Sequence, residues 1–241
     1  HNPAISAMKM ADPQKAGEVF TSALGSLLGN PKTKTVKALG ELKVIGANSL
    51  LVNMLDQNND TELQRNILRA LASIGNAESH KALLGVAKSS RYKPEPTGAT
   101  MALLEYAEEL GRSGNKDLSN EICLHLMKKC KTESQIHFKS FALEIYADNA
   151  GIKAATPLLV GAMKNGYKSY RMGAINYAIE KSGPSGPWVS ELANTKNPEV
   201  QAEIIFLLAS LNDKSALPRL TKYLNSPDAG VRSEAVSAIS C

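Results

Sequence analysis

Histidine, cysteine and serine are the residues of this 241-residue sequence that could most readily support catalysis or metal binding. None of the four histidines is followed by glutamate, and no two of them lie four residues apart, so the His-Glu-x-x-His motif of zinc hydrolases is absent. No serine lies in a Gly-x-Ser-x-Gly elbow, and no Gly-rich phosphate loop occurs. The sequence therefore predicts no catalytic residue and no cofactor, and we expect a protein that is not an enzyme.

Two cysteines fall in one predicted helix with a histidine between them. Cys123 and Cys130 are seven residues apart, which is about 10.5 Å of helical rise and too far for a disulfide between them. They share one face of the helix, whereas His125 points away from that face. No fourth ligand follows at a spacing typical of zinc sites. We therefore expect buried thiols and no metal site.

The charges of the sequence are dispersed. Its 28 lysines and arginines are interleaved with 23 acidic residues, which leaves a net charge of +5. A dispersed excess of this kind is typical of a solvated surface and differs from the basic stripe of a nucleic-acid groove. No stretch approaches the roughly 20 apolar residues that a membrane-spanning helix needs.

A repeated apolar pattern organises the chain. Starting from Val231, an equivalent apolar residue, here called an anchor, recurs at intervals of about 30 residues. The residues four and eight positions after each anchor are also apolar or glycine, as one face of an α-helix requires. The anchors are Val36, Leu63, Ala99, Phe138, Tyr170, Val200 and Val231.

A partner helix is expected before each anchor helix. No segment alternates apolar and polar residues in the manner of a strand, so the sequence predicts an all-α protein. One helical hairpin cannot bury its apolar stripe alone, so we expect the hairpins to stack into a single domain over residues 1–241. The expected partner helices are 13–29, 47–57, 77–89, 116–130, 152–165, 187–195 and 214–225.

The last hairpin resembles a known family. Residues 226–235, Ser-Pro-Asp-Ala-Gly-Val-Arg-Ser-Glu-Ala, resemble the turn and second helix of HEAT repeats, an armadillo-like family that includes the variety found in phycobilisome lyases. Residues 216–218 and 155–159 are similar to the first helix of that repeat. The resemblance implies a right-handed α-α superhelix of about seven hairpins, with the anchor helices on its concave side. It implies no particular activity.

The position after each anchor is often basic, as at Lys37, Lys139, Arg171 and Arg232. In HEAT proteins an arginine at this position is commonly structural and pairs along the stack with acidic residues of the turns. The resemblance therefore implies such pairs here, for which the sequence offers Asp148 and Asp213. Contact of these basic residues with a ligand is the alternative.

The residues two and six positions after each anchor point away from the apolar stripe and would line the concave groove. Their charges sum to zero, since two arginines are balanced by two glutamates. Apolar residues among them indicate a protein or peptide partner, although tilting of the helices could instead bury these side chains. The predicted partner-binding residues are Met172, Phe206, Arg65, Arg69, Met101 and Glu105.

These features favour a non-catalytic protein-interaction or scaffolding module, with no nucleic acid among its partners. Because the sequence starts at His1 and stops within a predicted helix, we expect it to be a fragment of a longer protein. HEAT arrays of this kind occur beside sugar-active domains in secreted bacterial proteins, so the resemblance implies a neighbouring domain of the same chain and favours an extracytoplasmic bacterial location. The alternative function is that of a HEAT-like DNA glycosylase or another nucleic-acid-binding protein.

Overall fold

The computed structural model describes residues 12–240 of the chain, and the secondary structure of this part is entirely helical. Its elements are α-helices, short 3-10 helices and connecting turns, and no strand occurs between residues 12 and 240. The prediction of an all-α fold of helical hairpins is therefore confirmed.

The chain forms two compact units, residues 1–138 and residues 139–241. Helix α9, Ile136–Ala150, begins at the end of the first unit and continues in the second. The other helices of the first unit are α2 Pro13–Leu24, α3 Gly29–Glu41, η1 Ile45–Ala47, α4 Asn48–Asp56, α5 Thr61–Ile74, η2 Ala77–Ser79, α6 His80–Ser89, α7 Ala99–Arg112, α8 Lys116–Lys129 and η3 Glu133–Gln135. Those of the second unit are α10 Ile152–Gly161, η4 Ala162–Lys164, α11 Lys168–Glu180, α12 Gly186–Asn194, α13 Pro198–Ser210, η5 Lys214–Ala216, α14 Leu217–Leu220, η6 Thr221–Asn225 and α15 Ala229–Ile239.

Helix α5 shows how the sequence sets the bounds of an anchor helix. The Asp60 side chain accepts hydrogen bonds from the backbone N–H groups of Glu62 and Leu63, so two donors at the start of the helix are satisfied. Gly75 ends the helix with a left-handed backbone at φ 67°, a conformation that costs glycine little. Between these ends, the apolar stripe that begins at Leu63 is buried.

The anchor pattern corresponds to the core. Every anchor and every residue four positions after an anchor is buried. The residues eight positions after the anchors are buried in most hairpins, but Val44, Tyr146 and Ile239 are half-buried. Val44 departs because α3 ends at Glu41, so Val44 lies in the following turn, where its side chain abuts Gly17 of α2.

Most partner helices lie close to the predicted ranges, but the first, predicted over 13–29, ends at Leu24, and several contain 3-10 turns. The segment 214–225, expected as one amphipathic helix, is divided into η5, α14 and η6. Pro218 contributes to this division because it has no backbone N–H to continue an α-helical hydrogen-bond pattern. The prediction of a single regular helix over this segment is therefore wrong, although its apolar residues Ala216 and Leu220 are buried as a helical stripe requires.

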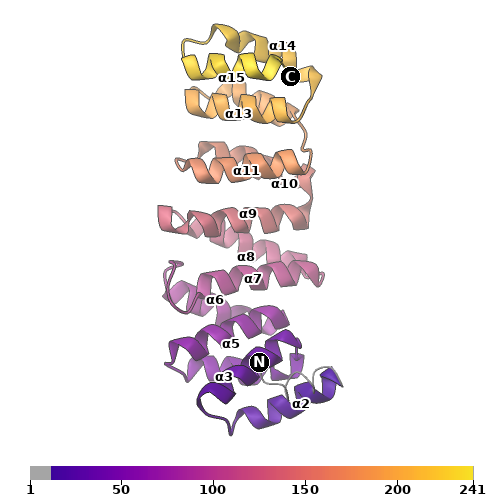
Figure 1. Ribbon diagram of the computed structural model, residues 1–241, viewed down its shortest axis with the longest axis vertical. Coiled ribbons are helices and arrows are strands. Elements are labelled where there is room, and N and C mark those ends of the chain that lie inside the picture. The colour runs from indigo at the N-terminus through magenta and orange to yellow at the C-terminus, as the bar shows by residue number, and fades with distance from the viewer. Residues whose placement is uncertain (1–11, 241) are drawn as a thin grey trace. The chain divides into compact units, whose positions relative to one another are not determined.

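Hydrogen bonds between neighbouring hairpins recur at about the repeat interval. In the first unit the Tyr106 hydroxyl donates to the carbonyl oxygen of Asn76 over 2.8 Å. In the second unit the Tyr223 hydroxyl donates to the carbonyl oxygen of Leu192 over 2.9 Å. Figure 1 shows the anchor helices α11, α13 and α15 of the second unit side by side in successive hairpins, where α13 contacts both of the others.

Candidate functional site

The residue after each anchor has a structural role in several hairpins. Gln64, Arg171, Gln201 and Arg232 each donate a hydrogen bond to the carbonyl oxygen six residues earlier, in the turn that precedes their own helix. The bonds of Arg171, Gln201 and Arg232 measure 3.0, 2.9 and 2.8 Å. These side chains therefore satisfy turn carbonyls that would otherwise need water.

Arg171 is the most completely bonded of these side chains. Its side chain is buried, and its Nε and one terminal nitrogen donate to the two carboxylate oxygens of Glu203 over 2.7 and 2.8 Å. The same terminal nitrogen lies 2.8 Å from a carboxylate oxygen of Glu199. The hydrogen bond to Glu203 is the largest cause that raises the pKa of Arg171. Both acids come from α13, so this cluster joins α11 to α13.

The acids that bond Arg171 are not those expected from the resemblance. Asp148 instead accepts a hydrogen bond of 2.7 Å from the Tyr177 hydroxyl and lies 3.6 Å from the Lys181 ammonium group. Asp213 accepts hydrogen bonds from the Ser185 hydroxyl and from the backbone N–H of Ser215, and the bond from Ser185 is the largest cause that lowers its pKa.

Four of the predicted partner-binding residues lie in the first unit. Arg65 donates from Nε to the carbonyl oxygen of Pro96 over 2.7 Å and so holds the segment that joins α6 to α7. Arg69 lines a hollow of about 220 Å³ between α3 and α5. Met101 and Glu105 are half-buried on α7. Burial raises the pKa of Glu105, and the nearby charge of Arg69 opposes that rise.

The remaining two predicted residues lie in the second unit and are accessible to solvent. Phe206 on α13 is 41% exposed, and Met172 on α11 is half-buried. Neither side chain is enclosed within the helical stack. Met172 is two positions after its anchor, and Phe206 is six positions after its own. On α11, α13 and α15, all residues at these two positions are uncharged. We call this set the uncharged strip: Met172, Asn176, Ala202, Phe206, Ser233 and Ser237.

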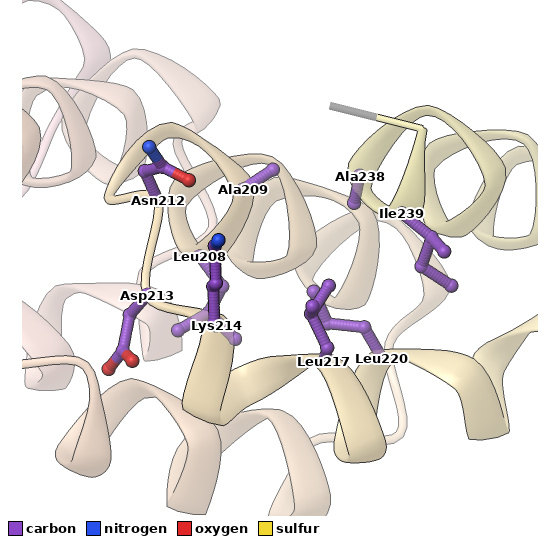
Figure 2. A pocket seen from close by; sticks show the side chains of 9 residues that line it. All are labelled: Leu208, Ala209, Asn212, Asp213, Lys214, Leu217, Leu220, Ala238 and Ile239. Carbon is purple, nitrogen blue, oxygen red and sulfur yellow. The ribbon is translucent and has the colours of Figure 1, made fainter.

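The sequence pattern did not reveal a small pocket at the last hairpin. Its volume is about 80 Å³, and it lies among α13, η5, α14 and α15. In Figure 2 the polar residues Asn212 and Asp213 lie at one side, and Ala238 and Ile239 lie at the other. Leu217 and Leu220 lie between them. The turn between α13 and η5 forms part of the wall of this pocket. The apolar period of the helices does not predict the conformation of such a turn.

The cysteines expected to be buried are buried. Cys123 and Cys130 are buried and form no disulfide, and burial raises the pKa of Cys123 to about 12. His125 accepts or donates a hydrogen bond of 2.8 Å with the hydroxyl of Tyr92, and burial lowers its pKa. Within residues 12–240, no three potential ligands are grouped closely enough to hold a metal ion.

Helix length and polarity bear on membrane insertion. In the described part of the chain, every helix is too short or too polar to cross a bilayer.

Comparisons with known proteins place the family signal at the end of the chain. Residues 186–240 match the family described as HEAT repeats. No curated protein matches the sequence. Among solved structures, the chain is similar to human deoxyhypusine hydroxylase in complex with glycerol, with 20% identity over 99% of this chain and 88% of that one and a TM-score of 0.38.

The comparison with deoxyhypusine hydroxylase corrects one expectation. The prediction that this protein is not an enzyme is contradicted, because that neighbour is an enzyme with a HEAT-repeat fold. A TM-score of 0.38 transfers no activity to this chain. Residues 186–240 thus match HEAT repeats, at the end of a chain built of helical hairpins with buried anchors.

Proposed function

We propose that this protein binds a polypeptide segment, from another protein or from a neighbouring domain, along the uncharged strip of its second unit. The observation that carries the proposal is the exposure of Phe206. Its neighbours Ile204, Ile205, Leu207 and Leu208 on α13 are buried, whereas Phe206 exposes 41% of its surface. Burying a phenylalanine or methionine side chain contributes about 1.5–3 kcal/mol. Exposed apolar side chains in a polar surrounding are typical of binding surfaces.

The polarity of the strip supports a polypeptide partner. Asn176, Ser233 and Ser237 offer hydrogen-bonding groups beside Met172 and Phe206, and no strip residue is charged. A single-stranded nucleic acid would favour basic side chains along its phosphates and several aromatic residues beneath its bases. A segment with one or two apolar anchors and a polar backbone fits the strip better.

The hydrogen bonds that join α11 to α13 favour binding of a partner without rearrangement of these helices. Arg171, directly before Met172, is bonded to Glu203 and Glu199 on the helix that carries Phe206. This buried cluster fixes α11 relative to α13, so the two apolar side chains are held at a constant separation. A surface that is already ordered loses little conformational entropy when a partner binds.

A peptide-display selection against the full chain tests the proposal. Peptides selected by the wild-type protein are measured for affinity to the double variant Met172→Ser/Phe206→Ser and to the control variant Leu224→Ser. Leu224 is an exposed leucine of the same unit, on η6, outside the strip. We expect the double variant to weaken binding at least tenfold and the control to change it less than twofold, with unaltered helical circular dichroism in both. Selected peptides that bind the double variant as tightly as the wild type would refute the proposal.

A further inference from the structure

Two basic segments of the first unit, far apart in the sequence, are joined at the surface. Residues 88–93 include the end of α6 and the start of its connection to α7, and residues 125–131 include the last turn of α8. The Tyr92 hydroxyl lies 2.8 Å from Nε2 of His125 and so links the two segments. Together they hold six cations and no carboxylate, whereas the net charge of the whole sequence is +5. These cations, here called the basic patch, are all exposed: Lys88, Arg91, Lys93, Lys128, Lys129 and Lys131.

A buried amide holds both segments in place. The side-chain nitrogen of Gln135 donates hydrogen bonds to the carbonyl oxygens of Arg91 and Tyr92 over 2.8 and 3.1 Å. The side-chain oxygen of Gln135 accepts a hydrogen bond of 3.1 Å from the backbone N–H of Lys131. Because Gln135 is buried, its polar groups need these partners. One side chain therefore ties the first segment of the basic patch to the second.

The backbone between these bonds has an uncommon conformation. Arg91 and Tyr92 both have φ 56°, in the left-handed region that residues other than glycine seldom adopt. Two such residues in succession are unfavourable and persist only where surrounding contacts hold them. Here the contacts are the hydrogen bonds to Gln135 and His125. The fold thus maintains an unfavourable backbone at the place where it brings the cations together.

The positive charge of the patch is not neutralised by neighbouring acids. Within residues 12–240, none of the six cations forms an ion pair with a carboxylate. The carboxylate of Glu95, which follows the first segment, accepts backbone hydrogen bonds at the start of α7 instead. Burial lowers the pKa of His125, and the charges of two lysines of the patch lower it further. Glu121 and Glu133, which flank the second segment, offset only part of the excess.

An exposed leucine beside the patch restricts the kind of partner. Leu124 on α8 is 45% exposed and lies one turn before Lys128. Nucleic-acid strands are bound by cations together with exposed aromatic rings on which bases stack, but Tyr92 is buried and its hydroxyl is bonded to His125. A membrane surface is bound by a helix with a broad apolar face. Cations around one leucine fit a polypeptide that is acidic and carries an apolar residue.

We propose that the basic patch and Leu124 bind an acidic polypeptide segment with one apolar residue among its aspartates and glutamates. The apolar residue contacts Leu124, and the carboxylates surround it. The guanidinium group of Arg91 can hold a carboxylate by two parallel hydrogen bonds, and the lysines act as less directional charges. This surface belongs to the first unit, so the proposal goes beyond the uncharged strip of the second unit and does not depend on it.

A fluorescein-labelled peptide of aspartates and glutamates around one central leucine serves as the probe. Its affinity for the full chain at low salt is measured by fluorescence anisotropy. We expect Lys128→Gln/Lys129→Gln to weaken binding about fivefold, because two exposed charge contacts are lost. The control Lys153→Gln/Lys164→Gln changes the net charge equally at two exposed lysines of the second unit. We expect this control to change the affinity hardly at all.

Two uncharged substitutions separate the geometry of the site from its net charge. Tyr92→Phe keeps the ring and every charge but removes the bond to His125, so we expect binding about threefold weaker. Leu124→Ser should weaken binding of the leucine peptide about threefold and leave unchanged the binding of a peptide with serine at its centre. Circular dichroism checks that each variant stays folded.

Three results would overturn the proposal. The first is equal affinity of the wild type and Lys128→Gln/Lys129→Gln for the leucine peptide. The second is an unchanged affinity of both uncharged variants, which would mean that the peptide responds to net charge alone. The third is tighter binding of duplex DNA or of phosphatidylserine vesicles than of the peptide, with the same loss in Lys128→Gln/Lys129→Gln, which would assign the patch to another class of partner.

Discussion

Arg171 shows how a charged side chain is accommodated inside a helical stack. Removing a guanidinium and a carboxylate from water is costly, and the cost is offset only when their hydrogen-bonding groups are satisfied. Arg171 meets that condition through Glu203, Glu199 and two turn carbonyls. The buried cluster thereby stabilises one arrangement of α11 and α13. Because Met172 lies on α11 and Phe206 on α13, the cluster also fixes the distance between these two side chains.

Replacing one member of this pair should be strongly destabilising. Arg171→Met leaves the Glu203 carboxylate buried without its cation, so we expect the free energy of unfolding to fall by about 3–5 kcal/mol. Adding Glu203→Leu removes the stranded charge and should recover a large part of that loss. Urea denaturation followed by circular dichroism measures both, with the exposed Arg219→Met as the control. A loss below about 1 kcal/mol for Arg171→Met would contradict the account of the cluster.

Cys123 makes stability depend on pH in the alkaline range. Burial raises its pKa from 9.0 to about 12, so the unfolded chain releases the thiol proton at a lower pH than the folded chain does. This contribution is fully present below about pH 9 and is lost as pH rises toward 12, with a slope of up to about 1.4 kcal/mol per pH unit. Tyr170, whose pKa is raised to about 12, acts in the same direction. Cys123→Ala should therefore reduce the slope of stability against pH above 9 without abolishing it, and an unchanged slope would refute this assignment.

At the scale of the elements, the apolar period explains which residues form the helices and their buried faces. Contacts between charged side chains explain how one helix is held to the next. The anchor stripe predicted the core because a 3.6-residue period places residues four apart on one face. The partner helix predicted over 13–29 ends at Leu24, and α3 begins at Gly29, seven residues before Val36. The apolar period also did not reveal the hydrogen bond from Arg65 to the carbonyl oxygen of Pro96. Pro96 lies in the segment between α6 and α7, whose length differs from that of the other connections. The pairing of Arg171 with Glu203 had a readable signal, a basic and an acidic residue 32 positions apart, about one repeat.

The contact between α3 and α5 depends on a glycine. A Cβ atom at Gly40 would lie 2.7 Å from the Cα atom of Ala70, a backbone atom that cannot move aside freely. Gly40→Ala should therefore destabilise the chain by about 1–3 kcal/mol. Gly85 on α6 has open space around it, so Gly85→Ala should stabilise the chain by roughly 0.5–1 kcal/mol through helix propensity. Thermal unfolding compares the two, and effects of the same sign would contradict the packing at Gly40.

At the scale of the whole molecule, the net charge of +5 is distributed over both units and is absent from the uncharged strip. The sequence predicted that Met172 and Phe206 would face away from the core, and both are accessible. It placed Arg65, Arg69, Met101 and Glu105 in the same groove, but these belong to the other compact unit. The periodic pattern identifies faces of helices and carries no information on how separate units combine.

The distribution of charge leads to an expectation for nucleic acids. Duplex DNA should bind only weakly, with an affinity that falls log-linearly with salt, as dispersed phosphate contacts require. Met172→Ser/Phe206→Ser should leave that affinity unchanged, because the strip takes no part in it. Electrophoretic mobility shifts at several salt concentrations measure both quantities. Tight binding at 200 mM salt that the double variant abolishes would favour a nucleic-acid function for the strip.

Photo-crosslinking tests the central claim, that the uncharged strip is the surface on which a polypeptide partner is bound. A benzophenone amino acid replaces Phe206, Met172 or, as the control, Leu224, and each protein is irradiated with the tightest-binding selected peptide. The account predicts crosslinks at positions 206 and 172, both suppressed by excess unlabelled peptide, and none at position 224. Crosslinking at position 224 without any at positions 206 and 172 would contradict it.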